Sequence, residues 1–119
     1  MGCQGSKSGG LDVATVTFNF GSVNVQGQEM LADLNSLAMR LERDRDTKVV
    51  IFQSANPEIW VCHYDTELLK DMSTEAVSRE DARLLDLQSV CERISKVPQA
   101  TIAKLEGSAR GGGHELALA

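Results

Sequence analysis

The chain has 119 residues, of which 42% are hydrophobic and 24% charged, and its formal net charge is −5. This length allows one domain at most, because single domains typically run to about 100–200 residues. The acidic balance disfavours attraction to nucleic acid or to an anionic membrane surface. No run of the sequence approaches the roughly 20 apolar residues that a membrane-spanning helix needs.

The cysteines are three in number and widely spaced: Cys3, Cys62 and Cys91. No C-x-x-C pair and no secretory hydrophobic segment accompanies them, so the sequence indicates neither a disulfide framework nor a metal site. We therefore expect an intracellular, cytoplasmic protein without a bound metal.

The first ten residues are rich in Gly and Ser and have no periodicity, which predicts a flexible tail before a domain over residues 11–119. The same residues fit the pattern for N-myristoylation on Gly2, and Cys3 is placed for a second acyl chain. Two acyl chains give a stable membrane anchor. Membrane attachment through Gly2 and Cys3 is therefore the alternative to a free tail.

The first part of the domain alternates between strand and helix patterns. Residues 13–20 are rich in β-branched and aromatic side chains and predict a strand, followed by a turn at 21–24. Apolar residues at three- and four-residue steps predict a helix over 28–43. The charged residues up to Lys48 indicate a solvated connection, and residues 49–52 predict a buried strand.

The second part repeats this alternation after a short segment at 60–65. A helix is predicted from residue 74 or 78 to 95, since Pro98 follows its end. Its expected inward positions are Leu84, Leu87, Cys91 and Ile94, with Leu85 flanking them. A strand over 100–105, a Gly-rich turn over 107–113 and a helix starting at His114 complete an α/β pattern with parallel strand pairing.

A strand, a Gly-rich turn and a helix in succession aim backbone N–H groups at an anion, either a phosphate or a developing oxyanion. Residues 107–113 lack the Lys-Ser/Thr of a P-loop and the G-x-G-x-x-G dinucleotide spacing. The single Arg-Gly-Gly at Arg110 does not indicate RNA binding on an acidic chain. Glu115 suits proton transfer beside such N–H groups, although the helix dipole alone also favours an acidic residue in a first turn.

The sequence from Lys96 to Ala103, Gly107, and the run from Gly111 to Ala117 (GGGHELA) resemble the active-site segment of the enoyl-CoA hydratase/isomerase, or crotonase, family. Weaker similarities follow in the family's order at residues 13–24, 28–44, 48–53 and 60–65. The resemblance covers residues 11–119, which correspond to the N-terminal half of the family's domain. It implies a crotonase-like α/β fold, a spiral of ββα units.

The resemblance also implies a thioester chemistry, in which two backbone N–H groups stabilise the enolate of an acyl-CoA. By position these groups belong to Gly112 and Tyr64. Glu115 matches the first of two glutamates that activate the water added to a 2-enoyl-CoA. Coenzyme A enters as part of the substrate, and no separate cofactor or nucleic acid is implied. The remaining residues expected at the substrate are Cys62, His63, Asp65 and Gly111.

Two residues depart from the family pattern, since Cys62-His63 replaces the usual Ala-Gly. If that Gly has a positive φ, His63 would adopt it only with strain. His63 could narrow the site, act as a further acid or base, or stabilise the loop. Cys62 beside His63 also suggests an activated thiol.

The family's second glutamate, its acyl pocket and its trimerisation helices correspond to positions beyond Ala119. Full-length members form trimers or hexamers, and the resemblance leaves the assembly of this chain open. We therefore expect either a hydratase-type enzyme or a truncated, catalytically inert remnant that associates with a full-length relative. Isomerase, dehalogenase, decarboxylase and thioester-hydrolase reactions use the same framework, because a fold does not fix its reaction.

Overall fold

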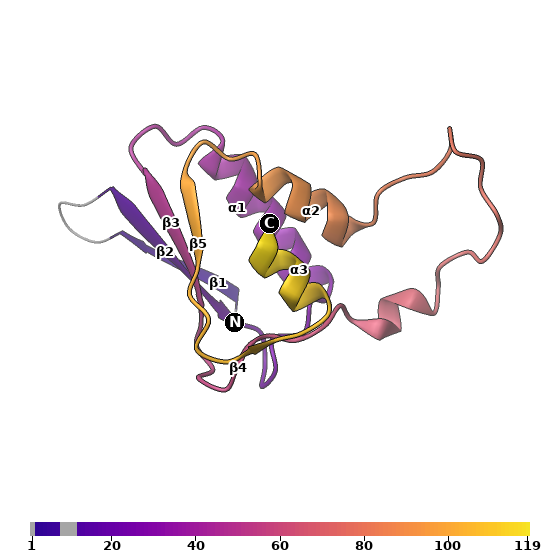
Figure 1. Cartoon of the computed structure of the whole chain (residues 1–119), viewed down its shortest axis with the longest axis horizontal. Helices are drawn as coiled ribbons and strands as arrows, with labels where there is room; N and C mark the ends of the chain where they lie inside the picture. Colours follow the sequence, from indigo (N-terminus) through magenta and orange to yellow (C-terminus); the bar gives the residue numbers. More distant parts are fainter. Residues whose placement is uncertain (1, 8–11) are drawn as a thin grey trace.

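The computed structural model describes residues 2–7 and 12–119 as two sheets with helices packed against them (Figure 1). The larger sheet has the strand order β1 (Gly2–Lys7), β2 (Val13–Asn19), β3 (Val49–Ser54) and β5 (Ala100–Ala103). β1 is antiparallel to β2, whereas β2, β3 and β5 are mutually parallel. The smaller sheet pairs β4 (Ile59–Val61) in parallel with β6 (Ser108–Ala109). The predicted α/β class with parallel pairing is confirmed.

Three α-helices share one core with the sheets: α1 (Gln28–Leu41), α2 (Asp86–Ile94) and α3 (Gly112–Leu118). Alternate residues are buried in β2 (Val16 and Phe18) and in β3 (Val50 and Phe52), as period-2 side-chain alternation requires. Phe18 of β2 stacks on Phe52 of β3 and meets the edge of Trp60 at ring-centroid distances of 6.1 and 5.3 Å. This aromatic cluster joins the large sheet to β4, which leads into the candidate site.

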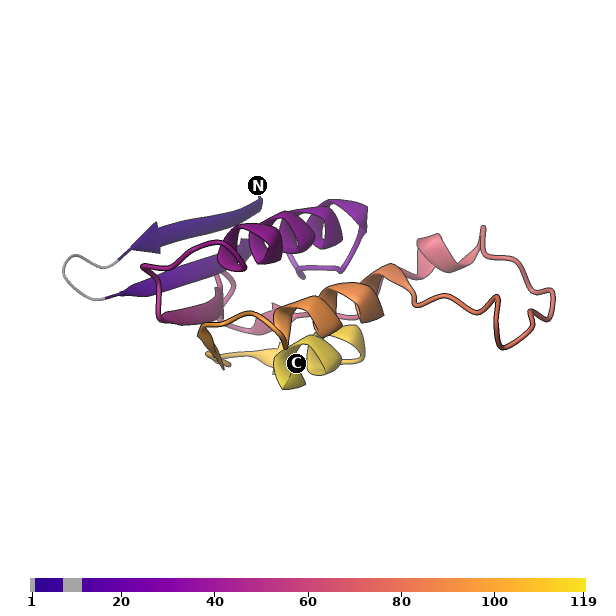
Figure 2. The same ribbon diagram turned by 90° about the horizontal axis from the view of Figure 1, so that it is seen from above.

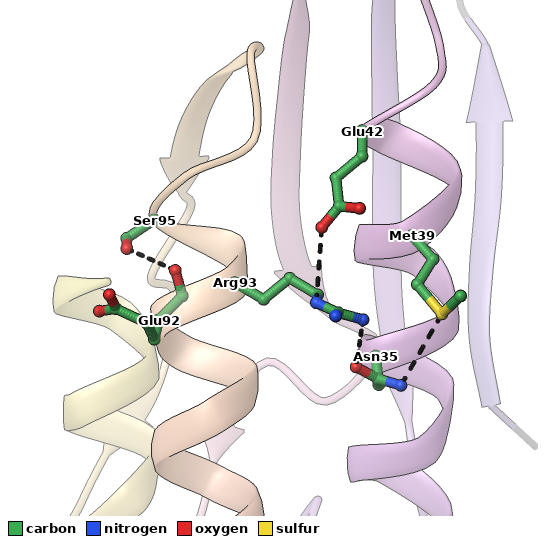
Figure 3. A network of polar contacts seen from close by, with 6 residues as sticks. All are labelled: Asn35, Met39, Glu42, Glu92, Arg93 and Ser95. Atoms are coloured by element: carbon green, nitrogen blue, oxygen red, sulfur yellow. Dashed lines mark hydrogen bonds and ion pairs between the residues drawn. The ribbon is translucent and has the colours of Figure 1, made fainter. Parts of the chain in front are cut away.

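The first helix follows the predicted pattern closely. Its buried residues are Met30, Leu31, Leu34, Ala38 and Leu41. Arg93 then fixes α2 against it, since its Nη1 donates to Asn35 Oδ1 at 3.0 Å and its Nε lies 3.4 Å from Glu42 Oε1 (Figure 3). The two helices run side by side in both views (Figures 1 and 2).

The predicted flexible tail is wrong for residues 2–7, whose backbone pairs with β2 along the whole of β1. Strand pairing uses only main-chain groups, so a Gly/Ser-rich composition does not prevent it. Residues 1 and 8–10, which complete that predicted tail, lie outside the described residues. The acylation of Gly2 and Cys3 stays a prediction.

The second helix begins eight or more residues later than predicted, at Asp86. Every residue from 69 to 86 is exposed, and this segment projects from the body of the protein (Figure 1). Leu84 is 62% exposed, so it is not an inward position, whereas Leu87, Val90 and Ile94 are buried. Cys91 is half-buried. A helix needs a buried face for stability, and the segment predicted as this helix has buried residues only from Leu87 onward.

Other boundaries differ by a few residues. The strand expected over 100–105 ends at Ala103, and β6 lies inside the predicted turn. A short 3₁₀ helix, η1 (Thr66–Leu69), follows the segment at 60–65 and was not predicted. No helix in the described part of the chain is long and apolar enough to span a membrane.

Candidate functional site

The Gly-rich turn leads from β6 into α3 through a backbone conformation that only glycine adopts easily. Gly111 has φ 51° and ψ −123°. Its carbonyl accepts the N–H groups of His114 and Glu115 at 2.9 and 3.1 Å, while the Gly113 N–H donates to Cys62 O at 2.9 Å. The N–H groups of Gly111 and Gly112 have no acceptor within residues 12–119.

Two further glycines lie in close contact with their surroundings, Gly113 with backbone and Gly112 with side chains. A Cβ on Gly113 would lie 2.1 Å from Val61 O, and one on Gly112 would lie 2.0 Å from Gln26 Oε1. Both residues are buried. The turn is therefore pressed directly against the segment that follows β4, with no side chain between the two backbones.

This opposing segment, residues 62–65, is held by the turn that precedes α1. Cys62 N–H donates to Asn24 O at 3.1 Å, Gln26 N–H to His63 O at 3.1 Å, and Asp65 N–H to Gln26 O at 3.0 Å. These bonds make an isolated parallel bridge between Gln26 and Tyr64. Because the neighbours of Tyr64 make the bonds, its own N–H points away from Gln26. The N–H groups of His63 and Tyr64 have no acceptor in the described ranges.

Asn24, in the turn before α1, connects this turn to β3 and β4 through hydrogen bonds. It is 1% exposed and has φ 48°, the only positive φ of a non-glycine among the described residues. Its Oδ1 accepts from Phe20 N–H at 2.8 Å, and its Nδ2 donates to Ser54 Oγ and Trp60 O at 2.9 and 3.0 Å. The left-handed conformation suits Asn, which tolerates it better than most residues. The sequence marked Asn24 only as a turn residue.

The expected strain at His63 is absent, since its φ is not positive. The imidazole Nδ1 lies 2.7 Å from Tyr64 O, and the side chain is exposed. Asp65 Oδ1 accepts the N–H of Glu67 at 3.0 Å and so caps η1. Asp65 therefore has a structural role in the loop, whatever it contributes to a ligand.

Glu115 lies in the first turn of α3 with its side chain exposed. Across from it, Cys91 of α2 is half-buried. Burial, with a smaller contribution from the Glu115 carboxylate, raises the pKa of the Cys91 thiol. The raised pKa keeps this thiol protonated and poorly nucleophilic at neutral pH.

The structure brings the Gly-rich turn and residues 62–65 together, and Glu115 follows the turn in α3. A Cβ on Gly111 would lie 3.3 Å from His63 Cβ, so the turn and the opposing segment are in contact. The Gly-rich turn and residues 62–65 therefore present unpaired N–H groups, and the exposed carboxylate of Glu115 lies in the first turn of α3. Such a set can donate to an anionic oxygen and exchange a proton nearby. Among the described residues, no three His, Cys, Asp or Glu side chains are grouped to hold a metal ion.

The family model for enoyl-CoA hydratase/isomerase matches residues 9–119. The chain belongs to the enoyl-CoA hydratase/isomerase family. The mouse protein "Enoyl-CoA hydratase domain-containing protein 2, mitochondrial" is 33% identical over 96 residues, which are 81% of this chain and 31% of that protein. The Idiomarina loihiensis "Fatty acid oxidation complex subunit alpha" is 29% identical over 113 residues, 95% of this chain and 16% of that protein.

The fold agrees with solved members of the family. A putative enoyl-CoA hydratase from Streptomyces avermitilis superposes with a TM-score of 0.78 at 34% identity, over 96% of this chain and 42% of that one. The predicted crotonase-like fold is thereby confirmed. This chain spans less than a third of the length of the curated relatives named above and less than half of that solved protein.

Proposed function

We propose that this chain provides one side of an acyl-CoA site and stabilises the enolate of a thioester. The thioester oxygen would lie between the N–H groups of Gly112 and Tyr64, which form an oxyanion hole. The observation that carries the proposal is that neither N–H group has an acceptor among the described residues, although their loops are fixed against each other. Donors that are already oriented need no reorganisation when the negative charge develops.

Glu115 is the proposed proton-transferring group. It lies three residues after Gly112, in the first turn of α3, and its exposed side chain is accessible to a substrate and to water. The simplest reaction is hydration of a 2-enoyl-CoA. The Glu115 carboxylate takes a proton from water as the water oxygen adds to C3, the electron pair of the double bond moves toward the thioester as the enolate, and C2 then takes a proton from the carboxylic acid so formed. In family hydratases this chemistry uses two glutamates, and Glu115 supplies the first.

The remaining predicted residues lie around the thioester rather than at the reacting atoms. Gly111 provides the left-handed turn that orients the Gly112 peptide. Cys62, His63 and Asp65 hold the Tyr64 peptide through their backbone bonds. Coenzyme A binds as part of the substrate in this proposal, which is supported by the enoyl-CoA hydratase/isomerase family match and by the name of the mouse relative, an enoyl-CoA hydratase domain-containing protein.

The proposal is tested by mixing the purified chain with crotonyl-CoA and following the loss of the enoyl-thioester absorbance. Glu115→Gln should lower the rate by about 10²-fold or more, since general acid–base groups contribute about 10²–10⁴-fold. Glu106→Gln is the matched control, because Glu106 is also exposed beside the turn and its carboxylate pairs with Lys104 at 3.3 Å, away from the N–H groups of the two loops. Equal rates for the unsubstituted chain and Glu115→Gln would remove Glu115 from the mechanism.

A second candidate is an inert chain that associates with a full-length relative. One observation favours it: apolar side chains stay exposed beside β5 and at the end of α3, with Ile102, Leu105 and Leu118 at 49%, 52% and 75% exposure. Native mass spectrometry of the chain mixed with a full-length relative distinguishes the two. A mixed assembly with no turnover and no acyl-CoA binding by the chain itself would support association over catalysis.

A further inference from the structure

Gln26 makes hydrogen bonds to both loops of the candidate site, to one through its backbone and to the other through its side chain. It lies between the Asn24 turn and α1, and its side chain is completely buried. Its backbone brackets Tyr64 through the bonds to His63 O and Asp65 N–H. Its side-chain Nε2 donates to Gly112 O at 2.9 Å. The two loops are thus tied to one residue from opposite directions.

The other half of the Gln26 amide makes this arrangement unusual. Oε1 is buried and has no hydrogen-bond partner among the described residues. A buried acceptor without a partner lowers the free energy of unfolding, so its presence in a folded protein needs an explanation. An apolar side chain of the same length would fill this space without that cost. The donor half of the amide is the part that an apolar residue cannot replace.

From these contacts we infer that Gln26 is a positioning residue that sets the spacing between the Gly112 and Tyr64 peptides. The inference rests on the proposed oxyanion hole and adds the residue that fixes its width. Displacement of a reacting group by about 1 Å can lower a rate by about 10²-fold. A residue that holds both donors therefore affects the developing charge more than it affects ligand binding.

The Gly112 contact gives this role a second structural basis. A Cβ at position 112 would lie 2.0 Å from Gln26 Oε1 and 3.1 Å from its Cδ. The amide therefore lies directly over the Gly112 Cα. If Gln26 is held there, Gly112→Ala must displace it, and the cost of Gly112→Ala should fall when Gln26 is already Ala. Additive costs for the two substitutions would contradict the contact.

The main experiment uses Gln26→Met, which keeps the length of the side chain and removes both the donor and the unpaired acceptor. Gln99→Met is the matched control. Gln99 is also buried with an unpaired Oε1. Its Nε2 donates to Leu41 O and Asp44 O, and neither acceptor belongs to the two loops of the site. Any general effect of replacing a buried Gln is common to both variants.

The functional measurement is the ultraviolet absorbance of bound acetoacetyl-CoA, an enolisable thioester, across a pH series. In Gln26→Met the enolate fraction at a given pH should fall by about tenfold, because the donors no longer hold one spacing. The total affinity should change much less. Gln99→Met should leave the enolate fraction unchanged while lowering the urea midpoint. Equal enolate fractions in Gln26→Met and the unsubstituted chain would overturn the inference.

A second measurement does not depend on any ligand. Amide hydrogen exchange in Gln26→Met should accelerate at Asp65 and at residues 113–115, whose N–H groups are hydrogen-bonded, and not elsewhere. In the unsubstituted chain, the side-chain amide protons of Gln26 should exchange far more slowly than those of exposed Gln28. Unchanged protection of both loops in Gln26→Met, or fast exchange at Gln26, would refute the positioning role. If the chain binds no acyl-CoA but these protections appear, the proposed function fails and the positioning role stands.

Discussion

The two loops of the candidate site are built on opposite principles. In the Gly-rich turn the positions are restricted by space, because a Cβ on Gly113 would meet the backbone of Val61 and Cys62, and one on Gly112 would meet the side chains of Gln26 and Leu87. In the opposing segment, residues 62–65, the backbone is held by hydrogen bonds to the Asn24 turn, and His63 is exposed. The residue type is therefore restricted at the glycines of the first loop, whereas exposed positions of the second loop tolerate other side chains. This explains why Cys62-His63 replaces the family's Ala-Gly without backbone strain.

The strongest test of this contrast is Gly113→Ala. The added Cβ would lie 2.1 and 2.5 Å from the carbonyl oxygens of Val61 and Cys62, so one of the two loops must move. We expect the free energy of unfolding to fall by about 3 kcal/mol or more, at the upper end of overpacking effects. Urea denaturation measures it. The control is Gly21→Ala, where φ is +69° but nothing lies within 4 Å, and a loss of about 1 kcal/mol follows from the left-handed backbone. Equal losses in the two variants would mean that space does not restrict the turn.

Asn24→Ala tests the hydrogen-bonded loop at its base. The substitution leaves Phe20 N–H and Trp60 O without their partner and places Ala in a left-handed conformation. A buried group that loses its partner costs about 1–3 kcal/mol, so we expect a loss of about 2–3 kcal/mol. Asn24→Asp keeps the acceptor for Phe20 N–H and loses the donor, and should therefore fall between Asn24→Ala and the unsubstituted chain in the same denaturation series. A neutral Asn24→Ala would show that the backbone bonds alone hold the loop.

His63→Ala should have little effect on folding. The backbone of His63 makes the bond to Gln26, and its imidazole is exposed, so we expect a change within about 0.5 kcal/mol. The same variant separates the interpretations of His63 in turnover of crotonyl-CoA. A large fall in rate with unchanged stability would identify an acid–base role, while an unchanged rate would leave His63 as a loop residue.

The smallest expected effect concerns Cys91. Its pKa is raised by burial and then by Glu115, so the folded protein holds this proton more tightly than the unfolded chain. The stabilisation is therefore present below the ordinary thiol pKa of about 8.5. It is lost as pH rises from there through the raised value. Iodoacetamide should alkylate Cys91 slowly in the folded protein, and Glu115→Gln should accelerate it at fixed pH. No acceleration would mean that burial alone controls the thiol.

Sequence reasoning recovered the features that depend on repeated or contiguous signals. The alternation in 13–20, the helical period in 28–43 and the Gly-rich turn each appear within a short window, and the structure contains all three. β1 was missed because strand pairing through the main chain leaves no mark in side-chain composition. The start of α2 was predicted too early. The residues before Leu87 have a sequence pattern compatible with a helix, but they are exposed and have nothing to pack against.

Only part of the candidate site could be predicted from the sequence. Glu115 and the glycines lie in one motif, so the pattern pointed to them directly. Gln26 gave no local signal, since a single Gln beside a turn is ordinary, and its partner Gly112 lies 86 residues away. Asn24 was identified as a turn residue, but its bonds to Ser54 and Trp60 depend on how β3 and β4 return to it.

That 86-residue separation has a consequence for how the protein folds. Contacts between distant parts of a chain form slowly, because the entropy of closing the intervening loop must be overcome first. The parallel strands β2, β3 and β5 are likewise joined only by long crossovers. We expect α1 and its neighbouring strands to consolidate early, while the Gln26–Gly112 bond closes in the last kinetic phase. During synthesis, the Gln26 side chain would then have no Gly112 partner until the Gly-rich turn has been made.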